Sequence, residues 1–241
     1  MFMKEGKYEK RVQMKYQDQN KIEIDVIFTL ANLFTNELLR KDLEIHLDTL
    51  ANPGWFFTIN LNSIVSCNSN DYIVLKSIKK SDSDWIELFT QNKELRFAAS
   101  TFNLIKSFRL LFEYIEKYIG SDFIIYGENE ILNKVVDWYS SSQNEDWEEY
   151  GGIHMDINCK RCRLRIKYYD LIYNFKNFKN CEKIKSDNDY YKYSLENYSS
   201  IGDVKDEKMF IGYSSLNNIS KLFEGFLYNL TFLEDTNGMN L

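Results

Sequence analysis

Two stretches of the chain show the same succession of hydrophobic patterns, first with a period of two residues and then with a period near 3.6. In residues 43–119, segments that alternate apolar and polar side chains predict four strands, at 43–48, 55–61, 72–75 and 84–89. Apolar residues at helical spacing from Phe102 to Ile119 then predict an amphipathic helix. Residues 153–230 follow the same plan, with strands predicted at 153–157, 163–169 and 190–195 and a helix over 216–230.

Each of these stretches is preceded by a shorter segment with helical spacing, at residues 26–39 and 131–139. The patterns together predict an α+β protein of two related units. Each unit is expected to be a four-stranded antiparallel meander with an N-terminal helix and a C-terminal helix packed on the sheet. The predicted organisation is an N-terminal extension over 1–25, a first unit over 26–120 and a second unit over 121–241.

Three short phrases occur twice in the same order, which indicates a tandem duplication. Residues 45–48 (Ile-His-Leu-Asp) return as 153–156 (Ile-His-Met-Asp), and residues 80–85 (Lys-Ser-Asp-Ser-Asp-Trp) return as 185–190 (Lys-Ser-Asp-Asn-Asp-Tyr). Residues 100–105 (Ser-Thr-Phe-Asn-Leu-Ile) return as 214–219 (Ser-Ser-Leu-Asn-Asn-Ile). The spacing between copies changes only by lengths typical of loop insertions, so the two halves are expected to share one fold.

Composition and charge narrow the classes of function. With 44% apolar residues in 241 the chain can bury a sizeable core, and a single proline argues against a flexible linker. The net charge of −6 disfavours binding to nucleic acid, which requires clustered Lys and Arg, and favours a basic protein partner. The sequence has neither a bilayer-length apolar segment nor a signal peptide at its start, so we expect a cytoplasmic protein with no membrane partner.

Several motifs resemble the bacterial immunity protein 53 family. The second copy carries Trp-Tyr at 138–139, Asp-Trp-Glu at 146–148 and Tyr-Gly-Gly-Ile at 150–153, which resemble the opening of the family pattern. The first copy carries Thr-Leu-Ala-Asn-Pro-Gly-Trp at 49–55, Ile-Asn-Leu at 59–61 and Ser-Asp-Trp at 83–85, which resemble its middle. The resemblance spans most of residues 26–232 and implies a protein that neutralises a cognate toxin of a polymorphic toxin system in interbacterial competition. It implies binding without catalysis or cofactors, and nucleases are one class of toxin in such systems.

Two segments are the candidate toxin contacts. Trp147 stands among four acids, and an aromatic residue in such a segment is a better candidate for an interface hot spot than for a core residue. The repeated Asp-x-Asp-aromatic phrase could mark a binding edge, whereas turn and cap chemistry explains it adequately and is the favoured interpretation. The candidate residues are Glu145, Asp146, Trp147, Glu148, Glu149, Asp82, Asp84 and Trp85.

A zinc site is the main alternative. His154, Cys159, Cys162 and Cys181 have the residue types of a Cys3His site, and Cys-x-x-Cys in a hairpin turn suits a tetrahedral zinc ion. The equivalent His46 occurs without such a pair, which favours half-buried, hydrogen-bonded histidines instead. A zinc-stabilised domain, a metal-dependent enzyme and a structural adaptor thus remain alternatives to the immunity protein. The sequence does not determine the oligomeric state.

Overall fold

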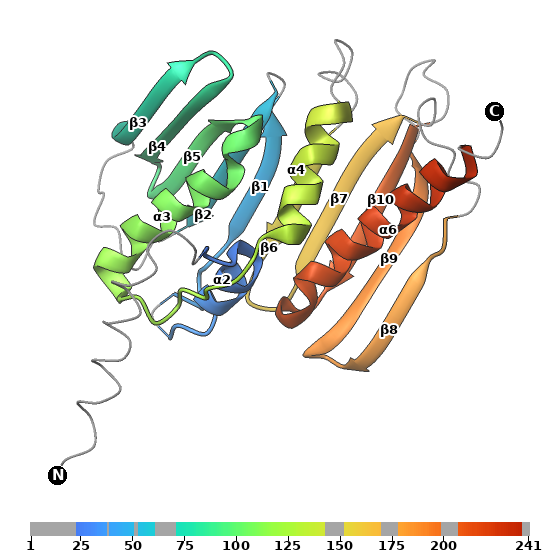
Figure 1. Ribbon diagram of the computed structural model, residues 1–241. Coiled ribbons are helices and arrows are strands. Elements are labelled where there is room, and N and C mark those ends of the chain that lie inside the picture. The colour runs from blue at the N-terminus through green and yellow to red at the C-terminus, as the bar shows by residue number, and fades with distance from the viewer. Residues whose placement is uncertain are drawn as a thin grey trace.

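The computed structural model describes residues 23–37, 39–50, 53–60, 71–142, 152–169, 178–198 and 207–237. Within them the chain forms one antiparallel sheet of ten strands in the order β3-β4-β5-β2-β1-β6-β7-β10-β9-β8 (Figure 1). The strands of the first half are β1 (Ile45–Leu50), β2 (Gly54–Asn60), β3 (Ile73–Ser81), β4 (Asp84–Gln91) and β5 (Glu94–Ser100). Those of the second half are β6 (Gly152–Ile157), β7 (Cys162–Tyr169), β8 (Cys181–Ser186), β9 (Asp189–Tyr198) and β10 (Glu207–Ser214).

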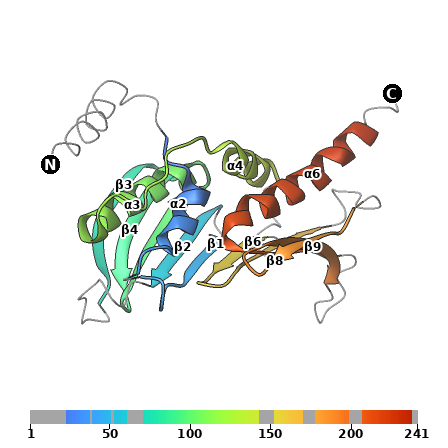
Figure 2. The same ribbon diagram turned by 90° about the horizontal axis from the view of Figure 1, so that it is seen from below.

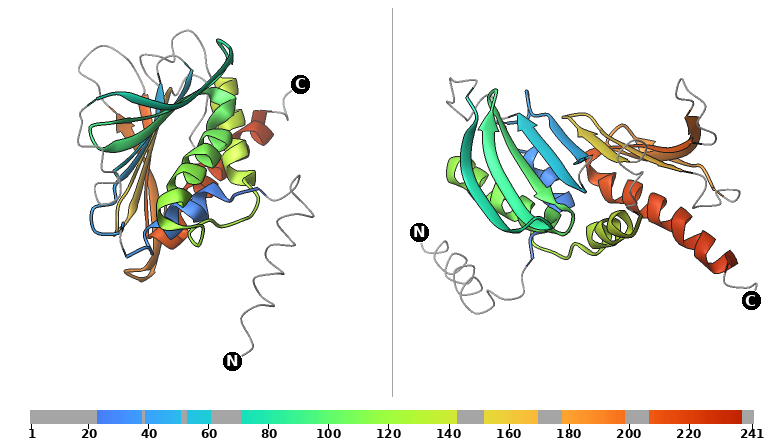
Figure 3. Two further views of the ribbon diagram at one scale, coloured as in Figure 1. Left: turned by 90° about the vertical axis from the view of Figure 1, so that its left-hand side faces the viewer. Right: turned by 90° about the horizontal axis from the view of Figure 1, so that it is seen from above.

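The described helices all cover the same face of this sheet (Figures 2 and 3). They are α2 (Val26–Leu33), α3 (Leu104–Ile119), α4 (Glu130–Ser142) and α6 (Ile219–Asn237), with short 3-10 turns η1 (Thr101–Asn103) before α3 and η3 (Leu216–Asn218) before α6. The alternation in β1 follows from this layering, because Ile45 and Leu47 are buried while His46 and Asp48 are half-buried. We call the sheet face that carries no described helix the open face.

The strand order of the first half, β1-β2-β5-β4-β3, is repeated by β6-β7-β10-β9-β8 in the second. The halves meet where β1 pairs with β6 in antiparallel register, with Leu47 opposite Met155. The predicted α+β class is confirmed, but the four-stranded meanders are wrong. Among the described residues each half has five strands, β2 pairs with β5 instead of β3, and the two sheets are continuous. Tandem duplication would produce this order and stays a prediction.

The sequence did not predict the central strand of either half. This strand is β5 in the first half and β10 in the second. Strand β5 follows a two-residue hairpin turn at Asn92 and Lys93, whose φ values of 54° and 66° are left-handed. Such turns usually contain glycine, so this one lacks the usual sequence signal. The strand itself alternates as expected, with Leu95, Phe97 and Ala99 fully buried.

Aromatic residues fill the layer between the sheet and α3. The rings of Phe57 and Phe97 stack with centroids 5.1 Å apart, and the edge of Phe108 meets both rings, at 4.9 and 5.1 Å. These geometries are favourable for aromatic pairs and add to the burial energy. Helix α3 is thus fixed across β2 and β5 in the first half.

Helix α4 connects the two halves above the sheet. Its Tyr139 is fully buried, and the ring lies 4.8 Å from that of Trp55 on β2. The Tyr139 hydroxyl lies 3.3 Å from both the backbone N–H and the carbonyl oxygen of Gly54. The Trp55 indole N–H donates to the Thr101 carbonyl at 2.7 Å, so one buried cluster holds β2, η1 and α4 together.

Candidate functional site

The repeated Asp-x-Asp-aromatic phrase takes part in the same hydrogen-bonded arrangement in both halves. We call this arrangement the lock; it consists of Asp84, Ser100 and Asn103 in the first half and of Asp189, Ser215 and Asn218 in the second. In the first, the Asn103 side-chain amide donates to Asp84 Oδ1 at 2.9 Å and to Ser100 Oγ at 2.8 Å. In the second, Asn218 donates to Asp189 Oδ1 and to Ser215 Oγ, both at 3.0 Å. The structure therefore pairs Ser100 with Ser215, whereas the sequence phrases align it with Ser214.

The lock fixes the carboxylates as structural groups. The hydrogen bond from Asn103 lowers the pKa of Asp84, and the bond from Asn218 does the same for Asp189. Each carboxylate also lies near a lysine, with Lys80 Nζ 3.4 Å from Asp84 and Lys185 Nζ 3.3 Å from Asp189. Hydrogen bonds to the charged form favour ionisation, so these groups are poor proton donors near neutral pH. These carboxylates hold the outer hairpin of each half, β3–β4 or β8–β9, against the 3-10 turn that leads into α3 or α6.

Asp82 and Trp85 lie on a surface groove of about 790 Å³ in the first half. Asp82 is 98% exposed and forms an ion pair with Lys79 at 2.9 Å, which lowers its pKa. Trp85 is half-buried, and Phe102 on η1 is 69% exposed. The groove residues come from the β1–β2 turn, β3, the β3–β4 turn, β4, β5 and η1: Pro53, Ser77, Ile78, Lys79, Asp82, Ser83, Trp85, Ile86, Glu87, Ser100, Thr101 and Phe102.

Two histidine–aspartate pairs lie side by side where β1 meets β6. The His46 Nδ1 atom lies 2.7 Å from an Asp156 carboxylate oxygen. The His154 ring contacts Asp48 through Nδ1 and lies 3.0 Å from Asp156 through Nε2. Arg165 on β7 lies 3.5 Å from Asp156. The predicted half-buried, hydrogen-bonded histidines are thereby confirmed, and each histidine bonds an aspartate of the other half.

The directions of the pKa shifts of His154 and Asp156 show that the cluster favours the charged form of both groups. The hydrogen bond to Asp48 raises the pKa of His154 despite its partial burial. Burial alone would raise the pKa of Asp156, but the bond from His46 and the charges of His154, His46 and Arg165 together lower it. The cluster therefore acts as an ionic clasp between the halves.

The structure does not bring the candidate zinc ligands together. Cys162 on β7 is buried on the helix side, and this burial raises the pKa of its thiol. Cys159 is exposed in the β6–β7 turn, and Cys181 lies on β8, separated from β7 by β10 and β9. Strands lie about 4.8 Å apart, so Cys181 is on the order of 14 Å from Cys162, too far to share one metal ion. No group of three potential ligands is found among the described residues.

The other predicted contacts, Glu145, Asp146, Trp147, Glu148 and Glu149, lie outside the described residues. Sequence reasoning did not identify Pro53 and Phe102 as groove residues. Both stand beside motifs that it did single out, and Phe102 had been assigned to the apolar stripe of the helix. The signal for the histidine–aspartate pairs was the doubled Ile-His-x-Asp phrase, which does not reveal that the two copies face each other.

Residues 34–115 match the family model described as Immunity protein 53. A search of curated proteins gave no significant match, and a search of solved structures also gave none. The matched residues contain β1 to β5, most of α3 and the whole groove.

The class of protein that the matched family model describes is an immunity protein. The resemblance of the chain to the immunity protein 53 family is thereby confirmed over 34–115, and the second half lies outside the matched residues. No helix in the described part of the chain is long and apolar enough to cross a membrane.

Proposed function

We propose that this protein binds a cognate bacterial toxin domain and neutralises it by stoichiometric occlusion, as part of a polymorphic toxin system. The observation that carries the proposal is the immunity protein 53 match over residues 34–115. An immunity protein acts through its binding surface, so no catalytic residue or cofactor is required. A nuclease is one candidate for the toxin.

The groove beside Trp85 is the surface of the first half that best fits such a contact. It lies wholly within the matched residues and offers an exposed ring, Phe102, next to the half-buried Trp85. Interface hot spots are typically aromatic side chains in a pocket surrounded by polar groups. Here Lys79, Asp82 and Glu87 supply the polar groups. We therefore place a toxin side chain in this groove.

The test is the affinity for the toxin domain encoded next to this chain, measured by calorimetry on purified proteins. Phe102→Ala should weaken binding by about 10-fold or more, as expected for truncating a hot-spot aromatic. Phe28→Ala is the matched control, because Phe28 is also an exposed phenylalanine, 47% accessible, but lies on α2 on the helix side. Failure of the wild type to bind would disprove the immunity function. Equal binding by Phe102→Ala and the wild type would place the contact elsewhere.

The acidic segment at residues 145–149 stays a second proposed contact. Its test is the double variant Trp147→Ala with Glu148→Lys, measured against the same toxin domain. A loss of affinity with an unchanged melting temperature would assign the segment to the interface. Unchanged affinity would remove it.

A further inference from the structure

Strand register aligns the two halves of the open face residue by residue. His46 pairs with Thr58 in β1–β2, and His154 pairs with Arg165 in β6–β7, so Thr58 is equivalent to Arg165 and Phe56 to Arg163. The two locks likewise make Glu87 equivalent to Lys192 and Ala98 to Tyr213. Three of these four open-face positions hold a cation in the second half, and one of their first-half equivalents, Glu87, lines the groove.

These cations gather around one aromatic ring, that of Tyr213 on β10. The charged groups of Arg161, Arg163 and Lys192 lie 5.9, 5.6 and 5.7 Å from its centroid. We call Arg161, Arg163, Lys192 and Tyr213 the cation patch. The negative face of the aromatic ring attracts each cation electrostatically.

No acid in the described part of the chain forms an ion pair with a cation of the patch, although Glu182 lies opposite Lys192 in the β8–β9 register. The nearby Asp156 is already shared by His46, His154 and Arg165. The buried Nε of Arg163 also has no hydrogen-bond partner there. The patch is thus a concentrated positive site on a chain whose net charge is −6.

The first half shows that the fold does not require these cations. Its equivalent positions hold Gly54, Phe56, Glu87 and Ala98, and the strand order is the same. Like charges gathered around one ring repel each other, so a role in stability alone does not explain them. A ligand that supplies negative charge would relieve that repulsion.

We propose that the cation patch binds an acidic segment of the cognate toxin, an inference that rests on the proposed function. Guanidinium groups bind carboxylates through paired, charge-assisted hydrogen bonds, and two of the three cations are arginines. A nucleic-acid strand fits less well, because its bases stack on free aromatic faces and three cations already surround the Tyr213 ring. The first half then contributes the aromatic groove to the interface and the second half the charge.

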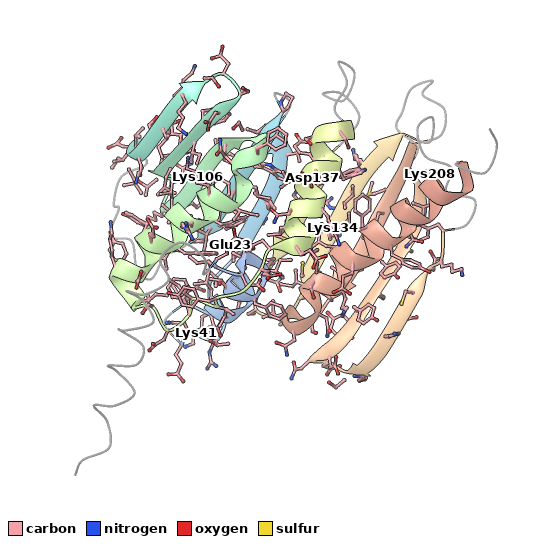
Figure 4. The ribbon with its side chains drawn as sticks, viewed as in Figure 1. Glu23, Lys41, Lys106, Lys134, Asp137 and Lys208 are labelled. Atoms are coloured by element: carbon pink, nitrogen blue, oxygen red, sulfur yellow. The ribbon has the colours of Figure 1, made fainter. Side chains whose placement is uncertain are left out.

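The test compares two double charge reversals in binding to the toxin domain. Arg161→Glu with Lys192→Glu changes two exposed members of the patch. Lys106→Glu with Lys134→Glu makes the same change in net charge on α3 and α4, on the helix side of the molecule (Figure 4). Both variants are first checked for an unchanged melting temperature, and affinity and association rate are measured at about 50 and about 300 mM NaCl.

The patch variant should bind about 100-fold more weakly, associate more slowly and show a smaller salt dependence than the wild type. The helix-side variant should stay within about 3-fold of the wild type. Arg163→Gln, which keeps a neutral polar side chain at the half-buried position, should weaken binding by about 10-fold.

Four results would overturn the inference. If the wild type does not bind the toxin, the immunity function and the inference fail together. If the wild type binds and the patch variant binds equally well, or both double variants weaken binding equally, only the inference fails. If the wild type binds a DNA duplex of about 20 base pairs and the patch variant does not, the partner of the patch is a nucleic acid.

Discussion

Removing the His154 ring should weaken the joint between the two halves of the sheet. His154 is the histidine of the clasp with two aspartate partners, because it contacts Asp48 through one nitrogen and lies 3.0 Å from Asp156 through the other. His154→Gln keeps a polar side chain on β6 but removes the positive charge. The opposed carboxylates then lose a shared cation, so the β1–β6 pairing loses stability.

The expected magnitude follows from how far the clasp is exposed. The side chains of His154 and Asp156 are 32% and 30% accessible. Exposed ion pairs contribute about 0.2–1 kcal/mol, and hydrogen bonds to charged groups about 1.5–3 kcal/mol. We therefore expect a loss of about 1–2 kcal/mol in the free energy of unfolding near pH 6. For a chain of this size that corresponds to a fall in Tm of about 2–8 °C.

The dependence on pH has a definite sign. The folded-state pKa of His154 is raised above its ordinary value of 6.5, so its contribution is complete below pH 6.5 and is lost as the pH rises through the raised value. The pKa of Asp156 is lowered from 3.8, so its contribution is present above that pH and is lost on acidification through the lowered value. The clasp is therefore strongest between about pH 4 and about pH 6.5.

The assay is thermal unfolding followed by circular dichroism from about pH 5.5 to about pH 8.5. The wild type should lose more stability over this range than His154→Gln, so the two Tm curves should converge at high pH. His46→Gln is the comparison variant, because the His46 ring contacts only Asp156 among the described residues and its removal should cost less stability at pH 6. Parallel curves for the wild type and His154→Gln would refute the clasp.

Two further substitutions test the packing. Asn103→Ala and Asn218→Ala should each lower the denaturant concentration at the midpoint of unfolding, because each removes the amide donor of a carboxylate. A loss in only one of them would show that the locks are not equivalent. Gly225→Ala in α6 should destabilise the protein although alanine favours helices, since the added Cβ would lie 2.3 Å from the Tyr193 ring. A rise in its Tm would show that β9 yields at little cost.

Local patterns identified the elements whose burial alternates, but they could not identify strand partners. Helix α3 and strands β1, β2 and β4 were predicted because their core-facing residues recur with the correct period. The edge strand β8 was missed, since Ile184 is exposed and its neighbours are polar. Pairing of β2 with β5 depends on contacts between segments some 40 residues apart, which periodicity does not encode.

The candidate sites were partly predictable for the same reason. Turn chemistry at Asp84 and Asp189 was one of the interpretations offered by the sequence, and the lock agrees with it. The groove and the cation patch could not be predicted, because both require strand register. Phe102 joins the Trp85 groove only when β5 lies beside β4, and Lys192 reaches Tyr213 only when β9 lies beside β10.

The repeated and the unrepeated features of the two halves separate structural from functional roles. The lock and the histidine–aspartate pairs recur at equivalent positions, and each connects elements that both halves contain. Glu87 and Lys192 occupy equivalent positions on the open face and carry opposite charges, although the strand order around them is the same. If these two side chains served stability alone, their equivalent positions would be expected to carry similar residues. Their opposite charge is better explained by different contacts made by the two halves, which is why we place the toxin across both.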